Sequence, residues 1–285
     1  MKSLAYYDGK IGAPEELTIP FNDRSHFFGD GVYDATVSGN HQPYLLQEHL
    51  DRFYTSAQAL DIKIGMSKAD LHALIIHLDQ QVEGNAHFVY WQVTRGCDTR
   101  NHAYADTMTG KLWVMIRPKK LSDPSIPVKL ITLEDTRFLH CNLKTLNLLP
   151  SVMASQKAEK AGAFEAVLYR GDVVTECAHS NVSILKDGVL RTHPSDRFIL
   201  RGIARMRLIE ACYRLGILVE ERAFTLAELM EADEVIVTSS TNFCLHASHI
   251  NGIPVGGQDA HRLSAIEHEV IQEYLAFTGC KSIFD

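Results

Sequence analysis

The sequence lacks the features of secreted disulfide scaffolds, membrane proteins and general nucleic-acid binders. Its six cysteines stand far apart in 285 residues, without a Cys-x-x-Cys pair, which indicates free thiols in a reducing compartment. No apolar run approaches the ~18 residues that cross a membrane, and the N-terminal segment carries charges where a signal peptide is apolar. Lys and Arg number 28 against 35 Asp and Glu, so the positive excess of a nucleic-acid binder is missing. We expect a cytoplasmic, soluble protein that binds neither nucleic acid nor membranes.

Proline is scarce outside one segment. Three of the nine prolines fall within residues 117–127, RPKKLSDPSIP. Proline removes a backbone donor and restricts the residue before it, so this segment should be extended. A chain of this length holds about two domains at roughly 150 residues each. We expect a smaller N-terminal domain over residues 1–117, a linker over 118–127 and a larger C-terminal domain over 128–285.

Hydrophobic periodicity predicts a mixture of helices and strands. The helices are expected near residues 46–60, after Ser67, and near 150–161, 202–215 and 260–277. The strands are expected at 87–94, 111–116, 128–134, 165–169, 218–224 and 234–239. Three Asx-Gly pairs, at residues 8–9, 187–188 and 251–252, predict tight hairpins because they tolerate positive φ. The order lacks the regular alternation of a doubly wound sheet, which favours an α+β fold.

One lysine stands among apolar residues in the segment NLKTLNLL, residues 142–149. An inward-facing Lys144 would lose hydration, which favours the neutral amine that Schiff-base chemistry requires. The alternative is an amphipathic segment whose lysine reaches solvent. The segment alone favours that alternative.

Glu176 ends an apolar, strand-like run and begins a segment of small polar residues. A carboxylate at such a strand end can keep a ring nitrogen protonated, because the opposite charge stabilises the cation. A glutamate that faces solvent is the commoner case. Cys177 and His179 follow, but no third residue to orient them is evident, which argues against a thiol nucleophile.

A loop-like segment after the strand at 87–94 contains Arg100 and His102. Arginine binds a carboxylate through two parallel hydrogen bonds, and a nearby histidine adds another donor. A solvated basic loop explains the same residues equally well.

Two segments carry weak signals for an anion site. Gly202 precedes a predicted helix whose first amides lack partners, as a phosphate site requires. The segment TSSTN, residues 238–242, offers hydroxyl groups after a predicted strand. Hydroxyl-rich turns are common, so neither segment is specific by itself.

Two other patterns do not support their usual functions. The Gly-x-Gly within FGDGVYD, residues 28–34, lacks the preceding strand, third glycine and following helix of a dinucleotide fingerprint. The 14 histidines raise the question of a metal, but strand alternation would place His246 and His249 on opposite faces. We expect no metal cofactor.

Taken in order, seven motifs resemble those of the fold-type-IV pyridoxal-phosphate enzymes, and more closely those of the D-amino acid aminotransferases of bacilli. The motifs are FGDGVYD (28–34), HLDRFYTSA (49–57), VTRGCDTRNH (93–102), CNLKTLNLL (141–149), VTECAHSNV (174–182), ILRGIAR (199–205) and VTSST (237–241). The resemblance implies a two-domain fold, with a small N-terminal α/β domain and a larger C-terminal domain whose β-barrel-like core is flanked by helices. It also implies pyridoxal 5′-phosphate as the cofactor.

The resemblance assigns roles to individual residues. Lys144 corresponds to the lysine that binds the cofactor as a Schiff base and moves the substrate proton. Glu176 corresponds to the carboxylate that pairs with the pyridine nitrogen. Arg137 stands where the family supports the O3′ region of the cofactor. The expected phosphate-binding residues are Arg52, Ile203, Ala204 and Ser240.

Tyr33, Arg100 and His102 match the residues with which the D-amino acid enzymes hold the substrate α-carboxylate. In those enzymes the Arg-x-His pair comes from the neighbouring subunit, so the resemblance implies a homodimer. Branched-chain L-amino acid aminotransferases and aminodeoxychorismate lyases share the fold but generally lack this loop. The loop therefore favours transamination between D-amino acids and 2-oxo acids, such as D-alanine with 2-oxoglutarate. Those two enzymes are the nearest alternatives, and a non-catalytic or metal-binding protein of the fold is a third.

The sequence departs from the family pattern at two places. Ala204 stands where a threonine often donates to the phosphate, which removes one hydrogen bond of about 0.5–1.5 kcal/mol. Ala178 and His179 replace small hydroxylated residues after Glu176. These departures concern the substrate range and not the cofactor.

Overall fold

Residues 2–284 are described by a computed structural model, in which the chain packs as two units. Unit 1 comprises Met1–Leu121, Leu143–Asn147 and Tyr274–Asp285, and unit 2 comprises Ser122–Asn142 and Leu148–Glu273. The first crossing between the units falls inside the expected linker, where residues 119–127 form neither helix nor strand. None of the helices within residues 2–284 is long and apolar enough to cross a bilayer.

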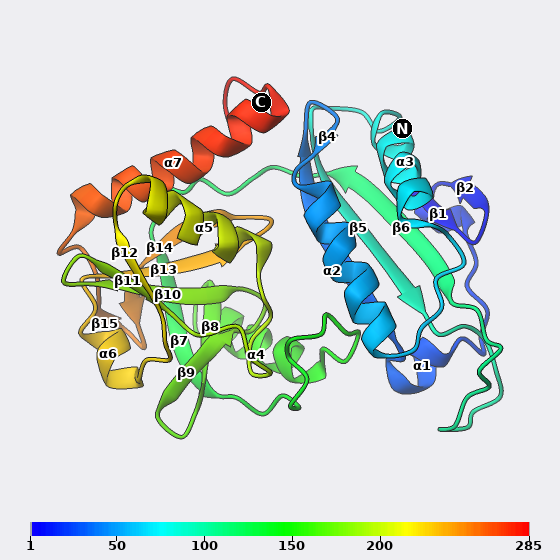
Figure 1. Cartoon of the computed structure of the whole chain (residues 1–285), viewed down its shortest axis with the longest axis horizontal. Helices are drawn as coiled ribbons and strands as arrows, with labels where there is room; N and C mark the ends of the chain where they lie inside the picture. The colour runs from blue at the N-terminus through cyan, green and yellow to red at the C-terminus, as the bar shows by residue number, and fades with distance from the viewer. Residues whose placement is uncertain (1, 285) are drawn as a thin grey trace. The chain divides into compact units, whose positions relative to one another are not determined.

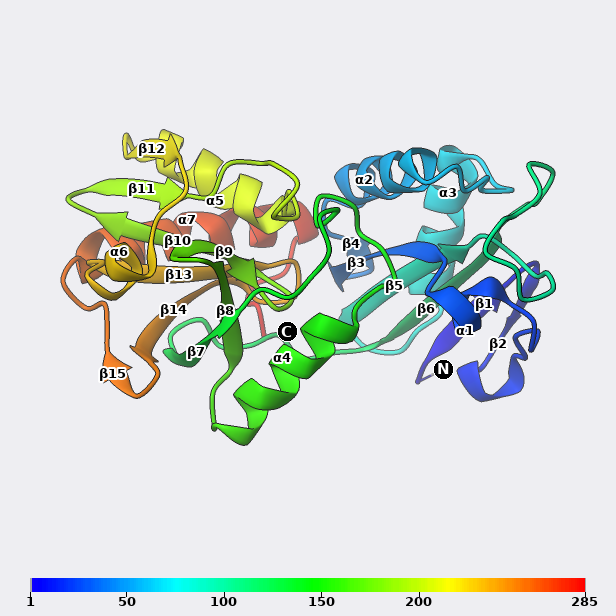
Figure 2. The same cartoon turned by 90° about the horizontal axis from the view of Figure 1, so that it is seen from below.

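Unit 1 is built on an antiparallel sheet of six strands in the order β2-β1-β6-β5-β3-β4. The strands are β1 (Leu4–Tyr7), β2 (Lys10–Gly12), β3 (Gly31–Gly39), β4 (Gln42–Pro43), β5 (Ala86–Thr94) and β6 (Lys111–Pro118). Its complete helices are η1 (Pro14–Glu16), α1 (Arg24–Phe28), α2 (Leu46–Ala59) and α3 (Lys68–Asp79). Figure 1 and Figure 2 show α2 and α3 along one face of this sheet.

The core of unit 1 follows from the spacing of apolar residues on α2. Leu46, Leu50, Phe53 and Ala57 recur at helical intervals and are all buried. They pack with alternate residues of the central strands, including the fully buried Trp91. This packing fixes the strand β3, which carries the expected site residue Tyr33.

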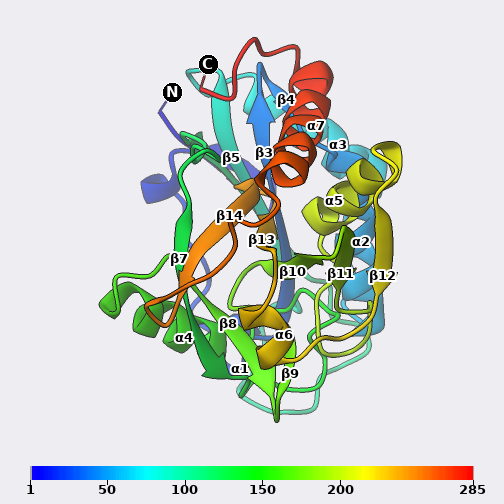
Figure 3. The same cartoon turned by 90° about the vertical axis from the view of Figure 1, so that its left-hand side faces the viewer.

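Unit 2 is built on a curled sheet of nine strands in the order β12-β11-β10-β13-β14-β7-β8-β9, with β15 paired to β14 (Figure 3). The strands are β7 (Val128–Glu134), β8 (Glu165–Arg170), β9 (Val173–Cys177), β10 (Asn181–Lys186), β11 (Val189–Thr192), β12 (Leu218–Glu221), β13 (Glu234–Ser239), β14 (Phe243–Ile250) and β15 (Ile253–Pro254). The helices are α4 (Leu149–Lys160), α5 (Ile203–Arg214), α6 (Leu226–Met230) and α7 (Ala260–Thr278), whose last residues belong to unit 1. This mixed α and β content, with a curled sheet flanked by helices, confirms the expected fold class.

Local sequence signals predict many of these elements correctly. All three Asx-Gly pairs form two-residue hairpin turns, and each Asp or Asn has a φ between 46° and 52°. The Ser67 side chain caps α3 by accepting from the backbone of Asp70. One expected strand is shorter than predicted. The strand expected over residues 218–224 is β12, which ends at Glu221.

The segment around Lys144 packs with unit 1, although in the chain it follows the linker. Tyr33 N donates to the Lys144 carbonyl at 3.0 Å, and Leu146 N donates to the Gly31 carbonyl at 3.0 Å. An isolated bridge joins Val32 to Thr145. These backbone contacts hold residues 143–147 along β3.

Candidate active site

Lys144 lies against Tyr33 in unit 1. Both side chains are half-buried, and Lys144 Nζ lies 4.3 Å from the centre of the Tyr33 ring. The Lys144 backbone N–H donates to Ser56 Oγ on α2 at 3.4 Å. Hydrogen bonds with β3 and with the Ser56 side chain on α2 therefore fix the position of the Lys144 backbone. The Tyr33 ring lies beside the Lys144 amine.

Arg52 on α2 is held by a buried carboxylate. Its Nε donates to Asp34 Oδ2 at 2.9 Å and its Nη2 donates to Asp34 Oδ1 at 2.7 Å. His49 Nδ1 contacts the same Oδ1 at 2.8 Å. Burial alone would raise the pKa of Asp34, but the Arg52 guanidinium and His49 outweigh it and hold that pKa well below its usual range. Asp34 is therefore ionised and fixes the plane of the Arg52 guanidinium.

Arg100 and His102 lie in the loop between β5 and β6, and both are exposed. The Arg100 guanidinium carbon lies 5.4 Å from the centre of the Phe28 ring. The His102 ring lies 5.0 Å from the same ring, tilted by 43°. The two side chains thus share one aromatic neighbour.

Glu176 lies at the end of β9 in unit 2 and is only 5% exposed. Its Oε1 contacts Arg137 Nη1. Its Oε2 accepts from Asn181 Nδ2 at 2.9 Å and from the Leu200 backbone N–H at 3.0 Å. These donors and the arginine charge stabilise an ionised carboxylate.

Arg137 is itself fixed by Asp135. Its Nε donates to Asp135 Oδ1 at 3.0 Å, and its Nη2 donates to Asp135 Oδ2 at 2.9 Å. Burial would lower the pKa of Arg137, but Asp135 and Glu176 raise it above its usual range. Burial would raise the pKa of Asp135, but the arginines beside it, chiefly Arg137, lower it to about 2. The guanidinium that meets Glu176 is thus a permanent, oriented cation.

The expected anion site corresponds to the N-terminus of α5. Gly202 is the N-cap residue and no side chain caps the helix, so the first amides, including those of Ile203 and Ala204, have no acceptor within the helix. A Cβ on Gly202 would lie 1.9 Å from Asn181 Oδ1. Only glycine allows this approach, and Asn181 is the residue that holds Glu176. Ser240 lies in the turn after β13.

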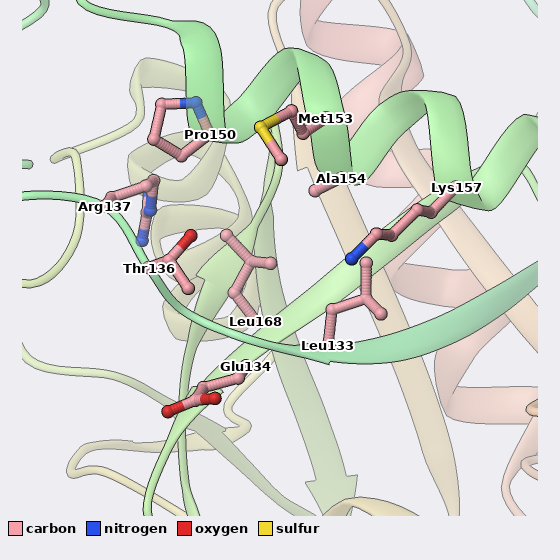
Figure 4. A pocket seen from close by; sticks show the side chains of 9 residues that line it. All are labelled: Leu133, Glu134, Thr136, Arg137, Pro150, Met153, Ala154, Lys157 and Leu168. Atoms are coloured by element: carbon pink, nitrogen blue, oxygen red, sulfur yellow. The ribbon is translucent and has the colours of Figure 1, made fainter.

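A pocket of about 200 Å³ lies between α4 and the strands β7 and β8 (Figure 4). Its lining residues are Leu133, Glu134, Thr136, Arg137, Pro150, Met153, Ala154, Lys157 and Leu168. Arg137 therefore borders this pocket as well as contacting Glu176.

The patterns set aside in the sequence have structural explanations. Burial raises the pKa of the Cys177 thiol well above its usual value, which disfavours a nucleophilic thiolate. His179 contacts the buried Glu165 through both its backbone N–H and its ring. His246 Nδ1 contacts Glu267, whereas His249 Nδ1 contacts Ser248.

A cluster of His41, Asp79 and His87 in unit 1 groups three possible metal ligands. Hydrogen bonds engage the ligand atoms. His87 Nδ1 contacts Asp79 Oδ1 at 2.7 Å and its Nε2 contacts the Glu83 carbonyl at 3.1 Å. Ser38 donates to the other oxygen of Asp79. Hydrogen bonding explains this cluster without an ion.

Asp34, His49, Asp135 and Asn181 were missed by sequence reasoning. Each acts through a residue that was expected, by orienting the guanidinium of Arg52 or Arg137 or the carboxylate of Glu176. No spacing rule predicts such pairs, because their members meet only in the folded protein. The sequence offered one signal for such a partner, which is the acidic Asp34 directly after the expected binding residue Tyr33.

Comparison with solved structures defines the fold. A branched-chain amino acid aminotransferase from Escherichia coli matches with a TM-score of 0.88 at 19% identity, over 98% of this chain and 95% of that chain. The branched-chain aminotransferase from the thermophilic archaeon Thermoproteus uzoniensis, solved with norvaline, matches with a TM-score of 0.86 at 20% identity, over 99% of this chain and 96% of that chain. At these identities the likeness shows the fold alone, which is that of the fold-type-IV aminotransferases.

Sequence relatives define the family. The model of the amino-transferase class IV family matches residues 31–250. A D-alanine aminotransferase of Listeria monocytogenes serotype 4b (strain F2365) is 41% identical over 266 residues, which are 91% of each chain. That of Bacillus licheniformis is 37% identical over 255 residues, 88% of this chain and 89% of the relative. The chain belongs to the amino-transferase class IV family. It is a pyridoxal-phosphate-dependent aminotransferase, which confirms the expected cofactor and reaction class.

The chemistry of the available groups fits this cofactor. The Glu176 carboxylate, paired with the Arg137 guanidinium, is suited to a protonated ring nitrogen. The α5 N-terminus offers free amides beside a glycine that permits close approach, as a phosphate requires. Lys144 supplies a primary amine, and Arg52 a guanidinium fixed by Asp34.

Proposed function

We propose that this enzyme transfers the amino group between D-amino acids and 2-oxo acids, for example from D-alanine to 2-oxoglutarate to give pyruvate and D-glutamate. The observation that carries this proposal is the Arg100-x-His102 loop in a chain about 40% identical to D-alanine aminotransferases over nine-tenths of both chains. Branched-chain aminotransferases resemble the chain in fold, but at only about 20% identity. They support the L-amino acid alternative less well.

We assign the proton transfer to Lys144. The bound cofactor supplies an electron-withdrawing ring that stabilises negative charge on the substrate α-carbon. Lys144 Nζ takes the proton from that carbon as a general base. The half-buried position of Lys144 against the Tyr33 ring supports this role, because it limits the directions the amine can take.

We assign the holding of the cofactor to residues of both units. Glu176, fixed by Arg137 and Asn181, would accept from the protonated ring nitrogen. The cofactor phosphate would be held by Arg52, the amides of Ile203 and Ala204, and the Ser240 hydroxyl. Because position 204 is alanine, a threonine hydroxyl is missing from this set, and the amides must supply more of the contact.

We assign the substrate α-carboxylate to Tyr33, Arg100 and His102. Arg100 and His102 are exposed in the single chain, which supports a homodimer in which the pair serves the neighbouring subunit's site. The cysteines within residues 2–284 are all free thiols, which supports a cytoplasmic location.

The test is an assay of matched D- and L-amino acids with 2-oxoglutarate. We expect turnover of D-alanine with ping-pong kinetics, and the same substrate should change the visible absorbance of the holoenzyme. L-Leucine and L-valine are the controls. Activity with these L-amino acids and none with D-alanine would overturn the proposal in favour of the branched-chain alternative.

Replacement K144A should abolish turnover, and full activity in that variant would contradict the role of Lys144.

A further inference from the structure

The loop that carries Arg100 and His102 is held on either side of that pair by contacts of Asp98 with Asn22, of Tyr104 with Arg95 and of the Asp106 carbonyl with Lys63. Residues 99–107 are all exposed, and residues 99–110 contain neither helix nor strand. Two groups that bind one carboxylate must nevertheless keep a fixed separation and direction, because small displacements weaken bidentate contacts. The segment from Arg100 to His102 therefore needs an anchor of its own.

Arg24 provides contacts of this kind. Its guanidinium donates from Nη1 to the Asn101 carbonyl, and from Nη2 to the His102 carbonyl at 3.1 Å. Its Nε donates to Asp30 Oδ2 at 2.8 Å. The two carbonyls are consecutive in the chain and lie on either side of the His102 α-carbon, so together they restrict the backbone direction of His102.

Arg24 is itself fixed on all sides. It is 2% exposed and begins α1, and its backbone N–H donates to the Gly96 carbonyl at 2.9 Å. Asp30, which accepts from its Nε, also accepts from Arg95 at 2.9 Å. Asp23 caps α1 and also accepts from Thr94 Oγ1 on β5 at 2.7 Å. These contacts hold the first turn of α1 against β5 and the residues that follow it, so the Arg24 guanidinium extends to the loop from a fixed backbone.

Phe28, at the other end of α1, sets the side chains of the loop. The Arg24 guanidinium carbon lies 4.9 Å from the centre of its ring, and that of Arg100 lies 5.4 Å from it. The His102 ring contacts the same ring at 5.0 Å. Helix α1 therefore contacts the backbone of the loop through Arg24 and its side chains through Phe28.

We propose that Arg24 is a positioning residue for the substrate carboxylate: it fixes the loop backbone at Asn101 and His102 so that Arg100 and His102 present their donors together. This inference rests on the proposed function, in which that pair binds the α-carboxylate. Arg24 does not touch the substrate. Removing its guanidinium leaves the Asn101 and His102 carbonyls without their charged donor, so the backbone there becomes more mobile. The expected result is weaker binding of the substrate carboxylate.

The experiment compares R24M and R24K holoenzymes with the wild type. R24M keeps an unbranched apolar side chain without the donors, and R24K restores one charged donor. We expect R24M to raise KM for D-alanine about tenfold or more, since it loses two charge-assisted hydrogen bonds, with a smaller change in kcat. R24K should recover part of the loss. The rate of reaction with hydroxylamine, which has no carboxylate, should stay that of the wild type.

Two controls separate the possible outcomes. R117M removes an exposed guanidinium from β6 in the same unit and should behave as the wild type. R100M removes a proposed carboxylate ligand and should raise KM for D-alanine like R24M. Backbone hydrogen exchange should be faster around residues 101–102 in R24M and unchanged in R100M, because Arg24 bonds the Asn101 and His102 carbonyls, whereas the Arg100 side chain lies over the Phe28 ring.

A raised KM in R100M with a normal KM in R24M would overturn the role of Arg24 and leave the proposed function intact. Equal losses with D-alanine and with hydroxylamine would also overturn it, because they indicate a general structural defect. No turnover of D-alanine by the wild type, or a normal KM in R100M, would instead contradict the proposed function.

Discussion

Asp34 and Tyr33 are neighbours on β3 with different environments. Successive residues of a strand point to opposite faces, so Tyr33 is half-buried beside Lys144 while Asp34 is fully buried beneath Arg52. One strand thereby supplies a residue for the proposed carboxylate site and a residue that orients a proposed phosphate ligand. The position of Arg52 depends on a buried charge that touches no substrate.

The replacement D34N tests that dependence. It leaves the Arg52 guanidinium without its buried partner charge, and breaking a buried pair costs about 3–5 kcal/mol. We expect a lower unfolding free energy in the cofactor-free protein and weaker binding of pyridoxal phosphate in an absorbance titration. The control D51N lies on the same helix as Arg52 and breaks an exposed pair with Lys68 of α3; it should cost no more than about 1 kcal/mol.

The pH dependence of the D34N effect has a definite sign. The pKa of Asp34 is below its ordinary value of 3.8 in the folded protein. Its contribution to stability is therefore complete above about pH 5 and is lost as the pH falls toward the folded pKa. The difference in unfolding free energy between wild type and D34N should be largest near neutral pH and should narrow below about pH 4. A constant difference across that range would contradict an ionised Asp34.

The N-terminus of α5 joins two parts of the candidate site through one glycine. Gly202 has ordinary helix-entry dihedrals, φ −67° and ψ 134°, so its backbone does not require glycine. The requirement is steric, because Asn181 occupies the place of a side chain at position 202. Asn181 in turn donates to Glu176 and to the Leu200 carbonyl.

The replacement G202A should therefore act on cofactor binding more than on overall stability. The new methyl group must displace Asn181, at a cost of about 1–3 kcal/mol, and both the Glu176 carboxylate and the α5 amides lose their arrangement. We expect the dissociation constant of pyridoxal phosphate to rise about tenfold. The control G162A has open space around the new methyl but a positive φ, so it should cost about 1 kcal/mol of stability and leave the dissociation constant unchanged. Equal affinities in the two variants would contradict the steric argument.

At the scale of the molecule, the proposed site residues come from separate stretches of chain. Lys144 packs with unit 1, whereas Glu176 and Arg137 pack with unit 2. The proposed homodimer adds a third source, because Arg100 and His102 are exposed in the single chain and are expected to serve the neighbouring subunit.

Mixing two impaired variants at a low concentration of D-alanine tests whether Arg100 serves the neighbouring subunit. K144A lacks the proposed base, and R100A lacks a proposed carboxylate ligand. If the pair serves the partner, a mixed dimer contains one intact site, and equal mixing restores about one quarter of wild-type activity. Each variant alone should stay far less active, and light scattering should give the mass of a dimer. No recovery in a verified mixed dimer would place Arg100 in the site of its own subunit.

The sequence alone determined the local elements and the family. Helical spacing in 46–60, the Asx-Gly turns and the Ser67 cap depend on neighbouring residues, so they are correct without tertiary information. Seven motifs in order were enough to identify the aminotransferase family.

Contacts between distant residues were decided only by the tertiary structure. Lys144 is placed by backbone bonds to β3, Arg52 by Asp34, Glu176 by Arg137 and Asn181, and the Arg100 loop by Arg24. The physical reason is that a buried charge is stable only beside its partner, and packing brings those partners together from positions that no sequence interval specifies.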